Sequence, residues 1–245
     1  MKVIGVIPSR LASSRLPRKA LADICGIPML THVIKRAQMS KVLNDLYVVT
    51  DSMEIAKIAQ DNNCKYFISV KDHNSGTDRI GEILPKLPED VDIIVNIQGD
   101  EALVSPDHID LSAQVLIDSF DFEISMLATK FKKTASLSDV KVALNLFDQI
   151  VYFSRADIPY QASNPTYYKA YHVVCFRVNA LKKFCSLDQS PIELVESIEY
   201  MRAIENNMKI GCKIVTSDAI SVDTPQDLET VRSLMLNDVF AKEYL

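Results

Sequence analysis

A short stretch near the start of the chain is rich in cations. Arg10, Arg15, Arg18 and Lys19 lie within 10 residues, with Ser13 among them. Arg and Lys side chains can share the negative charge of a triphosphate, and a guanidinium group binds phosphate oxygens in pairs. Neither GxxxxGK[ST] nor GxGxxG is present. The sequence therefore indicates phosphate binding mainly through side chains, and the alternative is a solvated basic surface.

Two carboxylates stand where a metal ion could join the phosphates. Asp100 lies within Gln98-Gly99-Asp100-Glu101, and Asp223 precedes Thr224-Pro225. Mg²⁺ prefers carboxylate, phosphate and water oxygens as ligands. Together with the basic loop, residues 9–19, the two carboxylates therefore predict a magnesium–triphosphate site. The alternatives are a turn at Asp100 and helix capping at Asp223.

A third polar group covers residues 73–79, with the sequence His-Asn-Ser-Gly-Thr-Asp-Arg. Its hydroxyl groups and backbone N–H groups are suited to hydrogen bonds with the edge of a pyrimidine base. A capped helix start is the alternative, because Ser and Asp are common at helix N-termini.

The elements that would position these groups alternate between strands and helices in the first half of the chain. Short Val- and Ile-rich runs indicate buried strands, and apolar residues at helical spacing indicate the helices between them. Such alternation predicts a parallel sheet with helices on both faces, whose ligands bind at the carboxyl ends of the strands. The expected strands are 2–7, 46–50, 65–70 and 93–97, and the expected helices are 28–37, 54–61 and 78–87.

The pattern changes after about residue 120. Longer apolar segments follow one another with few helices between them, which favours a mixed or antiparallel lobe. The expected strands are 124–131, 140–146, 150–153, 171–178 and 212–215, and the expected helices are 192–204 and 225–236, the last with Thr224 as N-cap.

The length of 245 residues suits one large α/β domain with a smaller lobe inserted in it. A net charge of −5 gives no general reason to expect binding to nucleic acid or to a membrane surface. The five cysteines form no zinc-type CxxC pair and indicate a reduced, cytoplasmic protein. The apolar run at residues 3–7 is far too short to span a membrane, and no signal peptide is visible.

Five motifs, in order along the chain, resemble the CMP-Kdo synthetase family, the 3-deoxy-manno-octulosonate cytidylyltransferases. The resemblance implies a Rossmann-like nucleotide-binding sheet with helices on both faces and a smaller mixed-sheet lobe for dimerisation and sugar binding. It implies a single nucleotidyltransferase domain over residues 1–245, with the lobe at about 121–210, and a homodimer. The motifs are Arg10–Lys19, Ser75–Arg79, Asn96–Glu101, Tyr152–Pro159 and Val222–Leu228.

The same resemblance implies roles for individual residues. Arg15, Lys19 and Asp100 would be catalytic, and Asp100 and Asp223 would bind Mg²⁺. The nucleotide-binding residues would be Pro8, Arg10, Ser13, Ser75 and Arg79. The sugar-binding residues would be Gln98, Arg155, His172 and Glu196.

One segment departs from the family pattern. The family typically has Lys-His-x-Gly-Ile-Tyr-x-Tyr-Arg where residues 169–177 stand here. Ala170 replaces the His, Val174 replaces the first Tyr, and His172 replaces the Gly. Because the missing side chains belong to the sugar pocket of the family, we expect weaker use of Kdo or a preference for an analogue altered at its distal carbons.

The expected reaction joins CMP from CTP to the anomeric hydroxyl of Kdo or a close analogue and releases pyrophosphate. The product would serve lipopolysaccharide biosynthesis. One alternative is a cytidylyltransferase for another acid such as a nine-carbon ulosonate. A glycosyltransferase would need an Asp-x-Asp metal motif, which is absent within residues 93–101, and an inactive binding module would not need Arg15, Lys19, Asp100 and Asp223 together.

Overall fold

The fold is described from a computed structural model of the chain. The structure describes residues 1–13, 15–131, 136–160, 167–216 and 220–245. The side chains of Tyr167 and His172 lie outside this description.

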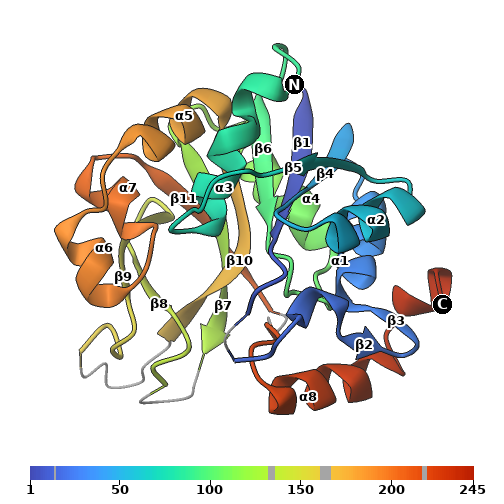
Figure 1. The fold of residues 1–245 in the computed structure, drawn as a ribbon. Helices are drawn as coiled ribbons and strands as arrows, with labels where there is room; N and C mark the ends of the chain where they lie inside the picture. The colour runs from blue at the N-terminus through green and yellow to red at the C-terminus, as the bar shows by residue number, and fades with distance from the viewer. Residues whose placement is uncertain (14, 132–135, 161–166, 217–219) are drawn as a thin grey trace.

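Within these residues, nine strands form one mixed sheet that runs through the molecule (Figure 1). It is a mixed α/β fold, as the alternation of elements predicts. The strands, in their order across the sheet, are β5 (Lys65–Ile68), β4 (Asp45–Thr50), β1 (Val3–Ser9), β6 (Ile93–Ile97), β10 (Tyr167–Arg177), β7 (Ile124–Phe131), β11 (Ile210–Val215), β9 (Gln149–Ser154) and β8 (Lys141–Leu144).

The first four strands of this order are parallel, as predicted. Val6 of β1 pairs with Tyr47 on one side and with Asn96 on the other, so the carboxyl ends of β1, β4 and β6 lie at the same edge. A Cβ atom on Gly99 would lie 3.0 Å from the carbonyl oxygen of Pro8. Glycine at position 99 therefore lets the turn after β6 pass close to the end of β1.

The strands of the second half continue the same sheet. β10 is antiparallel to both β6 and β7, while β7 and β11 are parallel to each other. The mixed character that we expected after residue 120 is therefore present, but its strands add to the first sheet. The separate lobe over about residues 121–210 stays a prediction.

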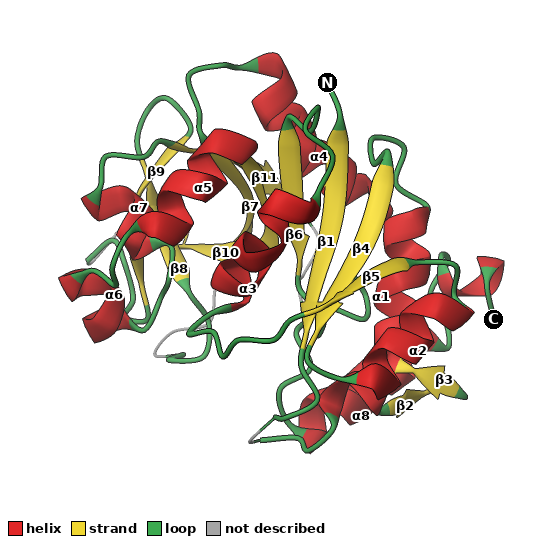
Figure 2. Cartoon of the chain, turned by 45° about the horizontal axis from the view of Figure 1, so that its top comes forward, coloured by secondary structure: helices red, strands yellow, loops and turns green. Residues whose placement is uncertain are grey.

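Helices cover both faces of the sheet (Figure 2). One face packs against α3 and α5 through a core that includes Ile80, Phe176 and Leu181. The other packs against α1, α2 and α4 through a second core. The helices of eight or more residues are α1 (Met29–Gln38), α2 (Met53–Asp61), α3 (Gly76–Ile83), α4 (Pro106–Asp118), α5 (Val178–Ser186) and α8 (Pro225–Met235).

The sequence analysis missed two helices and misread a third. It assigned no helix to α4 or α5, and it expected one helix over 192–204. That segment contains two short helices, α6 (Pro191–Glu196) and α7 (Met201–Glu205). Ser197 between them has a φ of 55°, a left-handed conformation that ends the first helix. The helical spacing continues through both pieces, so spacing alone does not reveal the break.

A small two-stranded ribbon, β2 (Asp23–Ile24) and β3 (Ile27–Pro28), separates the basic loop from α1. It packs with α8 in a third apolar cluster, below the sheet in Figure 1. The capping box of α8 pairs Thr224 with Asp227, which confirms Thr224 as its N-cap. No helix in the described part of the chain has both the length and the apolar character of a membrane span.

Arg36 of α1 holds the last residues of the chain against the sheet. Its side chain is fully buried, forms an ion pair with Asp238, and donates to the carbonyl oxygen of Val104 and the hydroxyl of Tyr244. A buried guanidinium must be satisfied in this way, because burying an unpaired charge is costly.

We expect Asp238→Ala to lower the free energy of unfolding by about 3 kcal/mol, because it leaves the Arg36 charge buried without its carboxylate. Asp61→Ala, which removes an exposed partner of Lys57, is the matched control and should cost about 0.5 kcal/mol or less. Urea unfolding of the two variants measures both quantities. Equal, small losses would show that the buried pair contributes no more than the exposed one.

Candidate functional site

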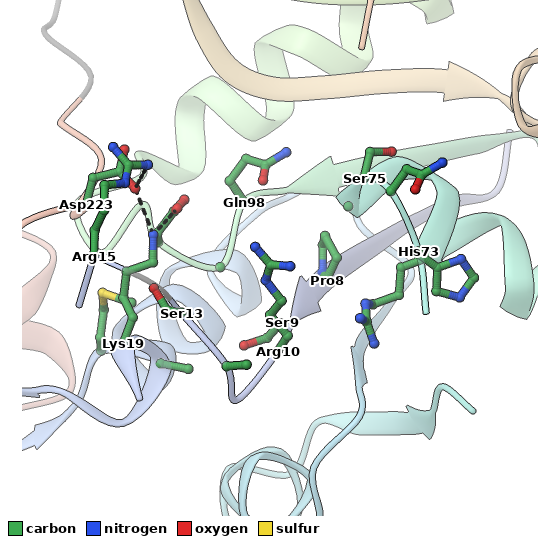
Figure 3. A pocket seen from close by; sticks show the side chains of 18 residues that line it. Pro8, Ser9, Arg10, Ser13, Arg15, Lys19, His73, Ser75, Gln98 and Asp223 are labelled. Carbon is green, nitrogen blue, oxygen red and sulfur yellow. Dashed lines mark hydrogen bonds and ion pairs between the residues drawn. The ribbon is translucent and has the colours of Figure 1, made fainter. Parts of the chain in front are cut away.

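A cavity of about 290 Å³ opens at the carboxyl ends of β1 and β6 (Figure 3). Arg15, Lys19 and Asp223 gather at one end of it, and His73 and Ser75 lie at the other. The cavity brings together residues from all three groups that the sequence singled out. Its lining includes Pro8, Arg10, Ser13, Arg15, Lys19, His73, Ser75, Arg79, Gln98, Asp100 and Asp223.

The basic loop bends over the end of β1 toward this cavity. The backbone N–H of Leu11 donates to the carboxylate of Asp51, which lies at the end of β4. Arg10 is exposed and makes no ion pair with any described residue, so its guanidinium is available to an anion. The β2–β3 ribbon separates this loop from α1, but Met29, the first residue of α1, does line the cavity.

Lys19 lies between the two carboxylates. Its Nζ is 2.6 Å from an oxygen of Asp100 and 3.0 Å from an oxygen of Asp223, and Arg15 pairs with the same Asp223 oxygen at 2.9 Å. Burial acts to lower the pKa of the Lys19 ammonium, but the attraction of the two carboxylates outweighs it, so the pKa is raised. Lys19 therefore stays charged beside the carboxylates at neutral pH.

The segment before α8, residues 220–224, brings Asp223 to Lys19, and we call this segment the strap. The backbone N–H of Val222 donates to the carbonyl oxygen of Asp100, at 3.0 Å. The capping of α8 uses Thr224 and Asp227, and the Asp227 carboxylate also accepts from the backbone N–H of Asp223. Thr224 and Asp227 therefore cap α8, as the alternative interpretation of this motif predicted. The carboxylate of Asp223 instead faces Asp100, with Lys19 between them.

The two carboxylates suit a magnesium ion that is shared with a substrate. An oxygen of each lies within 3.0 Å of one point, the Nζ of Lys19. No group of three or more His, Cys, Asp and Glu side chains in the described ranges could hold a metal ion. Mg²⁺ commonly takes one or two carboxylates and completes its shell with water and substrate phosphates. The pair Asp100 and Asp223 fits that pattern.

At the opposite end, α3 presents its N-terminus to the cavity. Ser75 is the N-cap of α3 and accepts from the backbone N–H of Asp78, so the capped helix start is confirmed. Arg79 is buried, and its contact with Asp51 spans 3.6 Å. Its Nη1 is buried without a hydrogen-bond partner among the described residues. Such a donor is costly to leave unpaired, and Arg79 is one of the residues that line the cavity.

His73 belongs to the same wall and is held from behind by Glu82. The Glu82 carboxylate lies 2.7 Å from the Nε2 of His73 and accepts from Ser69 and from the backbone N–H of Val70. Burial acts to raise the pKa of Glu82, but these hydrogen bonds outweigh it and lower the pKa to about 2. Glu82 thereby fixes the segment between β5 and α3.

A second cavity, of about 940 Å³, adjoins the first and shares Arg15, Gln98, Asp100 and Asp223 with it. Gln98 therefore stands on the wall between the two. The rest of this lining includes Leu137, Ser138, Asp139, Val140, Arg155, Lys169 and Ser197.

Arg155 lines the second cavity, but its guanidinium is largely engaged by the main chain. It donates to the carbonyl oxygens of Leu137, Ser138, Glu196 and Ser197. A guanidinium has five N–H donors, so one remains beyond these four contacts. In this conformation, a fork of two parallel bonds to a carboxylate would require one of these contacts to be released.

The other predicted sugar residues are placed differently. Glu196 does not line the described part of either cavity. Its carboxylate accepts from Ser154 and from the backbone N–H of Arg155, so it supports Arg155 from behind. The side chain of His172 lies outside the described residues. Sugar contact by Glu196 and His172 stays a prediction.

Two of the three departures from the family pattern, Ala170 and Val174, lie in the core. Ala170 is 2% exposed and Val174 is fully buried, and both belong to the apolar cluster on the α3 and α5 face. Neither lines the described part of the second cavity. In this structure the two substitutions change packing rather than a cavity-facing surface.

Two supports of the site, Asp51 and the pair Lys169–Asp139, had no predicted role from the sequence. Asp51 holds both the basic loop and Arg79, and its position directly after a buried strand was the available signal. The Lys169–Asp139 ion pair, at 2.6 Å, lines the second cavity. No local motif marks this pair, since its members lie on different segments.

Comparison with known proteins gives one consistent family. A cytidylyltransferase family model matches residues 4–210. A 3-deoxy-manno-octulosonate cytidylyltransferase from Francisella tularensis subsp. holarctica is 39% identical, over 94% of this chain and 96% of its own. One from Chlorobium phaeobacteroides is 36% identical, over 97% and 98%. A solved CMP:2-keto-3-deoxy-manno-octonic acid synthetase complexed with CTP superposes with a TM-score of 0.91 at 34% identity, over 96% of this chain and 99% of that one.

We expect Glu82→Gln to remove a pH-dependent part of the stability. The pKa of Glu82 is lowered from 4.5 to about 2, so its contribution is present above pH 4.5 and is lost as the pH falls toward 2. This contribution is on the order of 3 kcal/mol. Urea unfolding of wild type and variant should therefore give a difference that is largest above pH 4.5 and shrinks below it. A difference that does not change with pH would contradict this role.

Proposed function

The chain belongs to the cytidylyltransferase family, and we propose that it couples CMP from CTP to 3-deoxy-manno-octulosonate, with release of pyrophosphate. The observation that carries this proposal is the pair of adjoining cavities. They share Arg15, Gln98, Asp100 and Asp223, so two substrates bound in them would meet at these residues.

The similar proteins support both proposed substrates, 3-deoxy-manno-octulosonate and CTP. Those from Francisella and Chlorobium are named for 3-deoxy-manno-octulosonate, and the superposed synthetase is complexed with CTP. They match this chain over nearly its whole length. A nine-carbon ulosonate and a glycosyltransferase reaction have no comparable support.

In the proposed reaction, the anomeric hydroxyl oxygen of the sugar attacks the α-phosphorus of CTP. A bond forms between these atoms, the bond from the α-phosphorus to the bridging oxygen of pyrophosphate breaks, and the hydroxyl proton passes to solvent. Arg15 and Lys19 stabilise the charge that develops on the departing pyrophosphate. Arg10 and Ser13, on the same loop, hold the phosphates while Pro8 supports the nucleotide at the end of β1.

We further propose that Asp100 and Asp223 hold Mg²⁺. The bound ion would neutralise phosphate charge and lower the pKa of the attacking hydroxyl. Lys19 bridges the two carboxylates in the structure. With nucleotide present, its ammonium would turn from the carboxylates to the phosphates, because Nζ ends a flexible four-carbon stem.

The wall formed by Ser75 and Arg79 favours cytosine over uracil. The buried Nη1 of Arg79 is a hydrogen-bond donor that lacks a partner among the described residues. Cytosine offers acceptors at O2 and N3, whereas N3 of uracil carries a hydrogen. A donor directed at N3 would therefore pair with cytosine and not with uracil.

The sugar would occupy the second cavity. Gln98 faces both cavities, and Arg155 and Lys169 add cationic groups to the second. These charges suit the carboxylate that a 3-deoxy-2-ulosonic acid carries. The N–H of Arg155 that remains beyond its four carbonyl contacts would donate one hydrogen bond to it.

A homodimer and a sugar-binding lobe at about residues 121–210 complete the proposal. Large apolar side chains are exposed on the β8–β9 turn and on α6, where a partner subunit would cover them. They are Leu146, Phe147, Leu194 and Val195. The five cysteines are unpaired, which agrees with the cytoplasmic location that we propose. The product would serve lipopolysaccharide biosynthesis.

The direct test is pyrophosphate release from CTP and Kdo in the presence of Mg²⁺. We expect turnover with CTP, and a kcat/KM for UTP that is roughly 10- to 100-fold lower because a buried donor is left unpaired. Arg79→Met should narrow this difference. Equal kcat/KM for CTP and UTP in the wild type would contradict base selection by Arg79, and no turnover with Kdo would contradict the proposed function.

The metal assignment is tested by Asp100→Asn, which keeps the shape of the side chain and removes its charge. We expect kcat to fall by about 100-fold or more, since charge in the transition state is no longer neutralised. Asp110→Asn is the matched control, because this carboxylate binds Ser40 and lies outside both cavities. A folded Asp100→Asn variant with wild-type turnover at limiting Mg²⁺ would show that Asp100 does not hold the ion.

A further inference from the structure

Lys141, at the start of β8, has a fully buried side chain. Lysine is seldom buried completely, because its ammonium loses hydration unless protein groups replace the water. Burial lowers the pKa of Lys141, although Asp157 and Asp139 partly oppose this. No step of the proposed reaction uses this residue, so its burial calls for another explanation.

The ammonium of Lys141 is satisfied by the main chain. It donates to the carbonyl oxygens of Ser136 at 2.5 Å, of Asp139 at 2.9 Å and of Arg155. The nearest carboxylate oxygen in the described residues, on Asp157, is 3.8 Å away. Because an ammonium has three hydrogens, these three carbonyl groups occupy all of them.

Two of these carbonyl groups belong to residues on two walls of the second cavity, Asp139 and Arg155, and Ser136 directly precedes the first of these walls. Leu137–Val140 form one stretch of its lining, and Arg155 belongs to another, while Lys141 itself does not line it. Lys141 also pairs in register with Ser154 of β9 and with Lys169 of β10. Its ammonium therefore joins the two walls at the point where three strands meet.

Arg155 makes a complementary set of contacts. Its guanidinium donates to the carbonyl oxygens of Leu137 and Ser138 and to those of Glu196 and Ser197. The position of Arg155 thus depends on the segment that Lys141 holds, and Lys141 also holds the carbonyl group of Arg155 itself. Without the ammonium, three buried carbonyl oxygens would lose their donor, and the two walls would separate to admit water.

We propose that Lys141 is a positioning residue for the acidic sugar, and that it sets the spacing between residues 136–140 and Arg155 without touching either substrate. This inference rests on the proposed function, because it takes the second cavity as the sugar site. Nucleotide binding should be nearly independent of Lys141, since its carbonyl partners do not line the first cavity.

The test is Lys141→Met, which keeps a side chain of similar length and removes all donors. We expect KM for Kdo to rise about tenfold or more, with a smaller change in kcat. The Kd for CTP, measured by calorimetry without sugar, should stay within about twofold of the wild type. Arg36→Met is the control, since Arg36 is equally buried and donates to a carbonyl group, but lies outside both cavities. It should lose stability without a selective change in KM for Kdo.

Lys141→Ala provides a second variant, in which added ethylammonium can replace the lost donor. We expect ethylammonium to restore KM for Kdo toward the wild-type value and tetramethylammonium, which has no N–H, to leave it unchanged. Lys141→Gln retains two donors, so we expect its KM for Kdo to lie between those of the wild type and Lys141→Met. It takes the place of either other variant that fails to fold.

An unchanged KM for Kdo in these variants, or an equal rise in the Kd for CTP, would overturn the inference. If the wild type uses no acidic sugar, the proposed function fails independently, and amide hydrogen exchange then decides the role of Lys141. Faster exchange in Lys141→Met confined to residues 136–141 and 154–157 would support the positioning role. Unchanged exchange there would overturn it.

Discussion

The approach of two carboxylates, Asp100 and Asp223, is the constraint on which the site depends. Two negative charges close together repel each other and require a cation between them. Lys19 supplies it with contacts of 2.6 and 3.0 Å, and Arg15 adds a second. The sheet edge, the strap before α8 and the basic loop must all be in place for this arrangement. The two carboxylates would suit a metal ion, and the two cations beside them would suit a triphosphate.

The chemistry of the first cavity could be predicted from the sequence because its residues follow buried strands. Arg10, Ser75 and Asp100 each come directly after or near a strand end, and a parallel sheet brings such ends together. The caps at Ser75 and Thr224 were equally readable, since capping depends on residues within one turn. Local patterns thus described both the elements and the groups that they bring to the first cavity.

The second cavity could not be predicted to the same extent. Arg155 was expected to bind the sugar, yet four backbone carbonyl groups engage it. Carbonyl groups occur at every residue, so no sequence pattern shows which of them will meet a given cation. Likewise, Ala170 and Val174 stand where the family has polar residues, but the register of β10 places both in the core. Tertiary packing decides such cases.

The contact between Lys19 and Asp223 joins residues that are 204 positions apart. During synthesis, the basic loop and the strand ends around it leave the ribosome well before the strap that carries Asp223. The Lys19–Asp100 pair can therefore form before the strap is made, whereas the second carboxylate joins it only when the strap docks through Val222. Contacts of such long sequence separation slow folding. The order of synthesis thus delays assembly of the site until the rest of the sheet can already be formed.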